Sequence, residues 1–394
     1  MAASPMHSAA LLKFCFVRDG GLHGRGVYAA SNIPAGTIIF TESPFVEIEV
    51  GDGAEFAETM HVAIARTIVS GAVGEKEWLA PKLGKLHPLS MEAMVKECSY
   101  PSEIQEFMLE AALGKWDADE IALLIQRVRF NSFGSGLYEE SSLFNHACRP
   151  NCSKFSKQDP HTHLSTTEFV ATRDIAKDEE LTINYFGLLE YSFAYRDKLF
   201  YSQHFAHLDP SPFPADMEQV LSAAEESNAQ VLALEEDLDR EFHSVGLQGG
   251  EAHAAAAGDM LVRLQQLRSL AATLVGPAHL VLIRIDRLVV LLCVLTMSSV
   301  ADAKQRATTA MLLVTTGLAL YPVMEQHLGP QHCELATFLL DLHHAIEFLL
   351  SSHMAAAMHA AFPEQMGTFS KATRFSYKLK TQSARIQAQY GTKS

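Results

Sequence analysis

The sequence predicts an α+β protein in which small β-sheets come first and an all-helical region follows. Three observations lead to this prediction. Short runs rich in Val, Ile, Thr, Phe and Tyr, which are typical of strands, lie before about residue 210. The segment "LDPSPFPAD" (208–216) carries three prolines, as a linker does. Beyond it, apolar residues recur at helical spacing through most of the remaining chain.

Five runs predict strands in the first half: "GVYAA", "GTIIF", "FVEIEV", "TTEFVAT" and "ELTINYF". The link "NIPAG" (32–36) between the first two has the residues of a turn. Helical periodicity between about residues 52 and 130 predicts a helical insert in this half. Within the insert, Glu120 follows Asp117 by three positions, which is the pattern of a capping box at the start of a helix.

These patterns divide the chain into a domain at 1–207, a linker at 208–216, a helical domain at 217–370 and a basic tail at 371–394. The segment "VGPAHLVLIRIDRL" resembles "LGPQHCELATFLLDL", which lies 53 residues later. Such an echo favours a helical-repeat domain of the tetratricopeptide (TPR-like) kind. The tail has several basic residues and no acidic residue, and we expect it to be a solvated end.

Composition narrows the class of protein. The chain has 394 residues, of which 48% are apolar, and a formal net charge of −15. That charge disfavours direct binding to nucleic acid and suits a basic partner. The six cysteines are scattered, so we expect reduced thiols and a cytoplasmic or nuclear location. We see no secretory signal, and three charges inside the most apolar run (279–297) predict a buried helix and no membrane association.

The segment "LFNHACRPNCSKF" (143–155) concentrates groups that can carry chemistry. Cys148 and Cys152 could bind zinc with His161 and His163, although their spacing is not the usual one and no second cysteine pair exists. His146 and Cys148 could form a base and a nucleophile, but nothing nearby orients the histidine. Ordinary core packing is a third reading, so the segment alone leaves the question open.

The segment is the second of three motifs whose order along the chain is informative. They are Gly24-Arg25-Gly26, the run Asn145-His146-Ala147-Cys148-Arg149-Pro150-Asn151, and the run Glu179-Glu180-Leu181-Thr182-Ile183-Asn184-Tyr185. Together they resemble the motifs of SET-domain protein lysine methyltransferases, with Ala147 in place of a serine. The resemblance covers roughly residues 14–50 and 127–207. It implies SET-type small β-sheets, split by the helical insert.

The helical second half and the run "NSFGSGLYEESSLFNH" resemble the SMYD branch of that family. Two departures stand out. The insert has only Cys98, so the MYND zinc module is missing. The post-SET segment keeps Phe205 but has Gln203 in place of a tyrosine and lacks the cysteines, although His204 and His207 could replace them as ligands. We therefore predict that the protein binds no metal.

The resemblance also implies a cofactor and a set of site residues. S-adenosylmethionine would be held by His23, Gly24, Arg25, Gly26, Asn131, Asn145, His146 and Phe205. Tyr185 would stand at the point of methyl transfer, and Phe133 would line the channel for the substrate lysine with it. The implied function is transfer of a methyl group to a lysine of a protein, histone or non-histone. The alternative is an inactive SET-fold scaffold that acts through its helical domain in protein–protein interaction. We expect a monomer.

Overall fold

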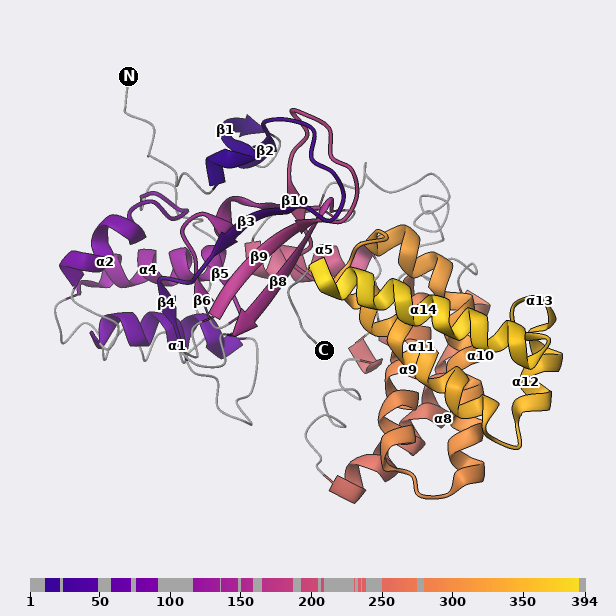
Figure 1. The fold of residues 1–394 in the computed structure, drawn as a ribbon. Coiled ribbons are helices and arrows are strands. Elements are labelled where there is room, and N and C mark those ends of the chain that lie inside the picture. The colour runs from indigo at the N-terminus through magenta and orange to yellow at the C-terminus, as the bar shows by residue number, and fades with distance from the viewer. Residues whose placement is uncertain are drawn as a thin grey trace.

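The structure is a computed structural model. It describes residues 11–21, 24–48, 58–71, 76–90, 116–134, 136–147, 150–158, 165–186, 193–204, 207–208, 230, 233–234, 236–238, 250–274 and 280–389. Figure 1 shows the strands gathered in one half of the molecule, coloured indigo to magenta, and long helices in the other half, coloured orange to yellow. The prediction of an α+β fold with small sheets followed by helices is confirmed.

The first half contains several small sheets rather than one large sheet. One antiparallel sheet has the order β3-β9-β8, made by Ile38–Glu42, Ser165–Ala171 and Cys152–Gln158. A hairpin joins β1 and β2, which are Cys15–Gly21 and Gly24–Ala29. A third sheet has the order β4-β6-β5, made by Val46–Glu47, Gly136–Leu137 and Ser132–Phe133. The last pair is parallel and joins β7 and β10, which are Asn145–His146 and Thr182–Ile183.

A compact aromatic and aliphatic core holds these sheets together. The ring of Phe144 stacks on that of Phe169 with 4.1 Å between their centres, and both rings are fully buried. Phe40 packs against both of them. Because Phe144 immediately precedes Asn145, this packing fixes the position at which the second motif begins.

The helical insert packs beside the sheets. Its described helices are α1, α2 and α4, which are Glu58–Val69, Lys76–Leu83 and Ala118–Asn131. The predicted capping box is present: the amide of Glu120 donates to Asp117 Oδ1 at 2.8 Å, and the amide of Asp117 donates to Glu120 Oε2 at 3.1 Å. Apolar residues of the three helices form a second core with β4 and β6. Helix α4 ends at Asn131, directly before the strand that carries Phe133.

The second half is an array of antiparallel helices in which each helix packs on the next. Helix α8 packs on α9, α9 on α10, and α10 on α11; their bounds are Gly250–Leu274, Leu280–Ser299, Ala303–Leu328 and Cys333–Leu350. A Cβ atom at Gly317 would lie 2.6 Å from Leu342 Cδ2, so the glycine allows α10 and α11 to approach closely. By length and composition, residues 303–326 of α10 pass for a membrane span, yet α9 and α11 flank this helix.

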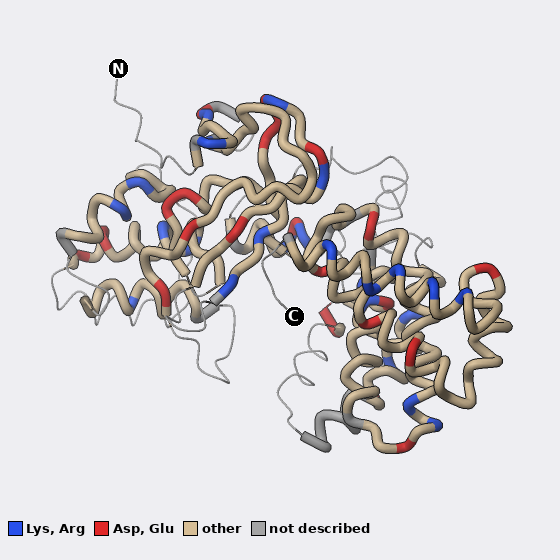
Figure 2. The backbone as a smooth tube through the Cα atoms, viewed as in Figure 1, with Lys and Arg blue, Asp and Glu red and all other residues tan. Residues whose placement is uncertain are grey.

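The expectation that residues 371–394 form a solvated tail is wrong over most of its length. Phe369–Gln389 is helix α14, which packs along α11. Its buried residues recur at helical spacing: Ala372, Ser376, Leu379, Ser383 and Ile386. Small and apolar side chains therefore face α11, while the basic residues of the helix, which suggested a tail, are exposed. Figure 2 marks the positions of Lys and Arg along this helix in blue. Short helices α12 and α13, Ala355–Ala361 and Pro363–Met366, lead into it.

The two halves are in contact through the sheet that contains β8 and β9. Ser153 Oγ lies 3.8 Å from Cys333 Sγ at the start of α11. A Cβ at Gly329 would lie 2.8 Å from the carbonyl oxygen of Thr172, so the turn before α11 also touches the end of β9. Val170 is buried in the core of the helical half, and Phe155 packs against it. The outer face of the sheet is therefore covered by helices.

Candidate active site

Backbone hydrogen bonds bring the three sequence motifs to one place. The amide of Leu181 donates to the carbonyl of Val27 at 2.7 Å, and that of Ala29 donates to the carbonyl of Glu179 at 2.9 Å. The amide of Ala147 donates to the carbonyl of Ile183 at 2.9 Å. Strand β2, which begins with Gly24-Arg25-Gly26, thus lies against the third motif, which in turn lies against Asn145 and His146.

Asn151, the last residue of the second motif, links the second motif to the third. Its side chain is 2% exposed, so its polar atoms must find partners within the protein. The amide nitrogen donates to the carbonyl of Glu180 at 2.8 Å and to Glu179 Oε1 at 2.9 Å, and the oxygen accepts from the amide of Thr182 at 2.9 Å. The sequence "PNC" therefore has a structural role next to whatever chemistry the motif performs.

Gly26 is the point of closest approach between the first motif and the others. A Cβ atom there would lie 2.5 Å from Glu180 Oε1 and 2.8 Å from Asn145 Nδ2. Asn145 Nδ2 donates to Glu180 Oε1 at 2.8 Å and to the carbonyl of Arg25 at 3.1 Å. Only a residue without a side chain leaves room for this arrangement. Arg25, Gly26 and Asn145, three of the residues predicted to hold a cofactor, are thereby brought together beside the Glu180 carboxylate.

His146 and Tyr185 are joined directly. The backbone amide of Tyr185 donates to His146 Nδ1 at 3.1 Å, so in this arrangement Nδ1 carries no proton. The Tyr185 hydroxyl donates to the carbonyl of Phe144 at 3.0 Å. Burial, and secondly the negative charge of Glu180, raise the pKa of Tyr185 well above its usual range. The phenol is therefore neutral at pH 7 and its oxygen keeps acceptor capacity.

The rings around Tyr185, which we call the tyrosine cluster, come from three separate segments, β5, β7 and α5. The ring of Phe133 meets that of Tyr185 edge-on with 6.1 Å between centres, and His146 and His204 each lie 5.3 Å away. Phe200 stacks on Tyr185 at 6.3 Å. Burial, with the positive charge of Arg129 next, lowers the pKa of His204 to about 4, so this ring is also neutral at pH 7. The cluster forms an apolar wall on one side of the convergent motifs.

Two members of the tyrosine cluster, Phe200 and His204, were missed as cluster residues in the sequence. They belong to α5, Phe193–His204, and the sequence suggested His204 only as a possible metal ligand. A third group was also missed: Lys154 places its Nζ atom 3.9 Å from the centre of the Phe133 ring. The sequence did offer one signal for Lys154, which is a charged residue between Ser153 and Phe155 in a strand that is covered on both faces.

Asn131 lies beside these residues but is engaged elsewhere. Its side chain is 2% exposed, and its amide nitrogen donates to the carbonyls of His87 at 2.6 Å and Arg127 at 2.7 Å. It therefore ties the end of α4 to the segment that follows α2 within the insert, and a contact with a cofactor stays a prediction. Arg25 similarly reaches the insert, where Nη2 donates to the carbonyl of Lys85 at 3.3 Å.

Several predicted residues lie outside the described ranges. They are His23, Phe205, Cys148, His161 and His163. Within the described ranges, no group of three or more His, Cys, Asp or Glu side chains is arranged to hold a metal ion. The prediction that the protein binds no metal stays a prediction.

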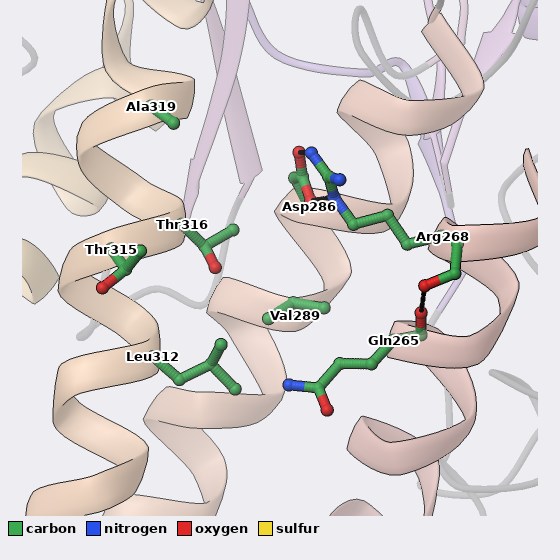
Figure 3. A pocket seen from close by; sticks show the side chains of 9 residues that line it. Gln265, Arg268, Asp286, Val289, Leu312, Thr315, Thr316 and Ala319 are labelled. Atoms are coloured by element: carbon green, nitrogen blue, oxygen red, sulfur yellow. Dashed lines mark hydrogen bonds and ion pairs between the residues drawn. The ribbon is translucent and has the colours of Figure 1, made fainter. Parts of the chain in front are cut away.

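A separate pocket of about 350 Å³ opens between α8, α9 and α10 of the helical half (Figure 3). Arg268 Nη2 and Asp286 Oδ2 form an ion pair at 2.9 Å on its wall, and Val289, Leu312 and Ala319 supply apolar surface. None of the motif residues lines it. The pocket is therefore distinct from the convergent motifs.

Comparison with known proteins gives these motifs a family. Residues 24–186 match the family model of the SET domain, a range that runs from the first motif through Tyr185. A 58-residue segment is 40% identical to "Potential protein lysine methyltransferase SET6" of Saccharomyces cerevisiae. That alignment covers 15% of this chain and 14% of the yeast protein.

Proposed function

We propose that this chain, which contains a SET domain at residues 24–186, is an S-adenosylmethionine-dependent protein lysine N-methyltransferase. The observation that carries the proposal is the position of Tyr185. Its neutral hydroxyl is oriented by the Phe144 carbonyl, within the tyrosine cluster and one hydrogen bond from His146. The gathered Gly26, Asn145 and Glu180 are connected to His146 through the second motif.

The donor set around Gly26 fits the amino-acid part of S-adenosylmethionine. The glycine keeps side-chain atoms away, so a ligand can approach the backbone. The Glu180 carboxylate is suited to a positively charged amino group, while Arg25 and His146 offer donors for a carboxylate. When bound, S-adenosylmethionine supplies a methyl group on a sulfonium cation. Gly24, Arg25, Gly26, Asn145 and His146 would hold it, and the roles of His23, Asn131 and Phe205 rest on the family resemblance.

The tyrosine cluster meets the first demand of the reaction, which is a neutral acceptor amine. A free lysine has a pKa of about 10.4, so removing its proton at pH 7 costs about 4.6 kcal/mol. Aromatic and neutral imidazole rings desolvate the ammonium form, which lowers the pKa of an amine placed among them. Phe133, Phe200 and the uncharged His204 exclude water from this region. The cluster therefore reduces the free energy needed to present a nucleophilic amine.

Tyr185 meets the second demand, which is alignment of the amine. Because its proton is donated to the Phe144 carbonyl, the phenol oxygen can accept a hydrogen bond from the acceptor amine. Its raised pKa means that it orients the amine and does not act as a base. Holding two reacting groups in line can supply roughly 7–11 kcal/mol of the barrier.

The substrate class is a lysine in a basic segment of a protein, since the chain carries a net charge of −15. We expect the helical half to contribute one wall of the substrate site, because it is already packed on the sheet that carries Lys154 and Phe155. Action as a monomer in the cytoplasm or nucleus completes the proposal.

The test separates an enzyme from an inactive scaffold. Calorimetric titration of S-adenosylmethionine into the full chain should give a saturable heat, and radiolabelled cofactor should transfer label to bulk cellular protein. Acid hydrolysis should recover the label as methyl-lysine. Saturable binding without any transfer would favour the scaffold that acts through its helical domain. Absence of binding would contradict the proposed enzyme and would also favour that scaffold.

A further inference from the structure

Lys154 introduces an amine into the tyrosine cluster from within the chain. It belongs to β8, and its Nζ atom lies 3.9 Å from the centre of the Phe133 ring. Phe133 in turn packs edge-on against Tyr185 with 6.1 Å between ring centres. One aromatic ring therefore separates this amine from the hydroxyl at the proposed point of methyl transfer.

The direction of the Lys154 side chain follows from strand geometry. Successive side chains of a strand point to opposite faces of the sheet. Ser153 lies against Cys333, and Phe155 packs on the core of the helical half. Lys154 between them must point the other way, into the SET half, and its contact with Phe133 agrees with this. The placement is thus set by the backbone and is not a chance position of a surface side chain.

Lys154 also lacks the ion pair that a lysine usually has when it leaves water. Lys157, three positions later on the same strand, pairs with Glu168 Oε1 at 2.8 Å. Among the residues that the structure describes, no carboxylate pairs with Lys154, and its amine makes a cation–π contact with the face of the Phe133 ring. Burial lowers the pKa of Lys154 to about 8, so a larger share of this amine is neutral at pH 7 than for a free lysine.

We propose that Lys154 is a methylation site of this protein itself, whose Nζ accepts a methyl group from S-adenosylmethionine bound to the same SET domain. The inference rests on the proposed function. The lone pair of Nζ forms the new N–C bond while the C–S bond of the sulfonium breaks and its electron pair stays on sulfur. The proton of the former ammonium passes to water. The reaction therefore needs no reactant besides the cofactor.

The first experiment follows the methyl group. Full-length protein is incubated with S-adenosylmethionine that carries a deuterated methyl group, and its peptides are mapped by mass spectrometry. We expect label on Lys154 and none on Lys157, and a rate that does not change when the protein is diluted, because donor and acceptor share one chain. Lys154→Arg should remove this label, whereas Lys157→Arg should leave it.

A second readout needs no turnover. S-adenosylhomocysteine has no methyl group to give, so any effect it has on Lys154 reports position alone. We expect it to slow the modification of Lys154 by an amine-reactive reagent several-fold and to leave Lys157 unaffected.

The outcomes separate this inference from the proposed function. Label on lysines of other proteins without label on Lys154 would overturn the inference and keep the function. Cofactor binding without methylation of any lysine, or equal reactivity of Lys154 with and without S-adenosylhomocysteine, would also overturn the inference. Failure to bind the cofactor would overturn both.

Discussion

Replacing Gly26 by alanine perturbs the point at which all three motifs meet. The new Cβ would lie 2.5 Å from Glu180 Oε1 and 2.8 Å from Asn145 Nδ2, closer than atoms can pack. Both atoms belong to the ends of side chains, so they can move, but the movement separates them from each other and from Arg25. Two hydrogen bonds, Asn145 to Glu180 and Asn145 to the Arg25 carbonyl, are then lost.

The magnitude follows from these two bonds. Each contributes about 0.5–1.5 kcal/mol to stability, and alanine recovers roughly 0.4–1 kcal/mol by restricting the unfolded chain. We therefore expect Gly26→Ala to lower the free energy of unfolding by about 1–2 kcal/mol, measured by urea denaturation. The affinity for S-adenosylmethionine, measured by calorimetry, should fall as well.

Two comparisons make the reasoning refutable. Gly258→Ala in α8 places its Cβ in open space, so it should raise the free energy of unfolding by about 0.8–1.0 kcal/mol, the difference in helix propensity. In an Asn145→Ala background, Gly26→Ala should cost less than in the wild type, because one displaced partner is already gone. Full additivity of the two substitutions would show that the contact at Gly26 does not act through Asn145.

Three further predictions concern Asn145, His332 and Lys154. Asn145→Ala should weaken cofactor binding in the ground state, and a calorimetric affinity equal to the wild type would remove the residue from the cofactor site. Burial of His332, the N-cap of α11, lowers its pKa to about 4. The stability that the neutral ring contributes is therefore complete above pH 6.5. It is lost as pH falls from 6.5 to 4, by at most about 1.4 kcal/mol per pH unit. His332→Asn keeps a capping side chain and should reduce that acid-induced loss, as seen in urea unfolding at pH 7 and 4.5. Because the pKa of Lys154 is lowered to about 8, Lys154→Met should raise the free energy of unfolding at pH 7 by on the order of 2–3 kcal/mol. This gain should shrink as pH rises from 8 to 10.5. An unchanged free energy of unfolding at pH 7 would show that the amine is well solvated.

The parts of the fold that the sequence predicts well are those specified by local chemistry. The Asp117–Glu120 capping box is an example, since its two bonds form within four residues. The tail at 371–394 shows the opposite case. Its basic residues suggested exposure to solvent. The buried face of its helix includes Ala372, Ser376 and Leu379, and because two of these side chains are small, the face is not strongly hydrophobic in the sequence.

The candidate site shows the same division. Motif residues such as Asn145 and Tyr185 are recognisable in the sequence because they occur in fixed spacing. Phe200 and Lys154 carry no motif, and they meet Tyr185 or Phe133 only through tertiary packing of α5 and β8. The hydrogen bond of Asn131 to the carbonyl of His87 also depends on where the insert folds back, which no local pattern encodes.

The most direct test of the central claim is the rate of a single turnover by Tyr185→Phe, measured with enzyme saturated with S-adenosylmethionine. The substitution removes a hydroxyl that donates to the Phe144 carbonyl and leaves the ring in the tyrosine cluster, so the fold and the cofactor affinity should be kept within a few-fold. We predict that methyl transfer to protein lysine slows by about 10²-fold or more, because a group that orients the acceptor in the transition state is lost. A rate equal to that of the wild type, with the same bound cofactor, would contradict the account of Tyr185 as the residue at the point of methyl transfer.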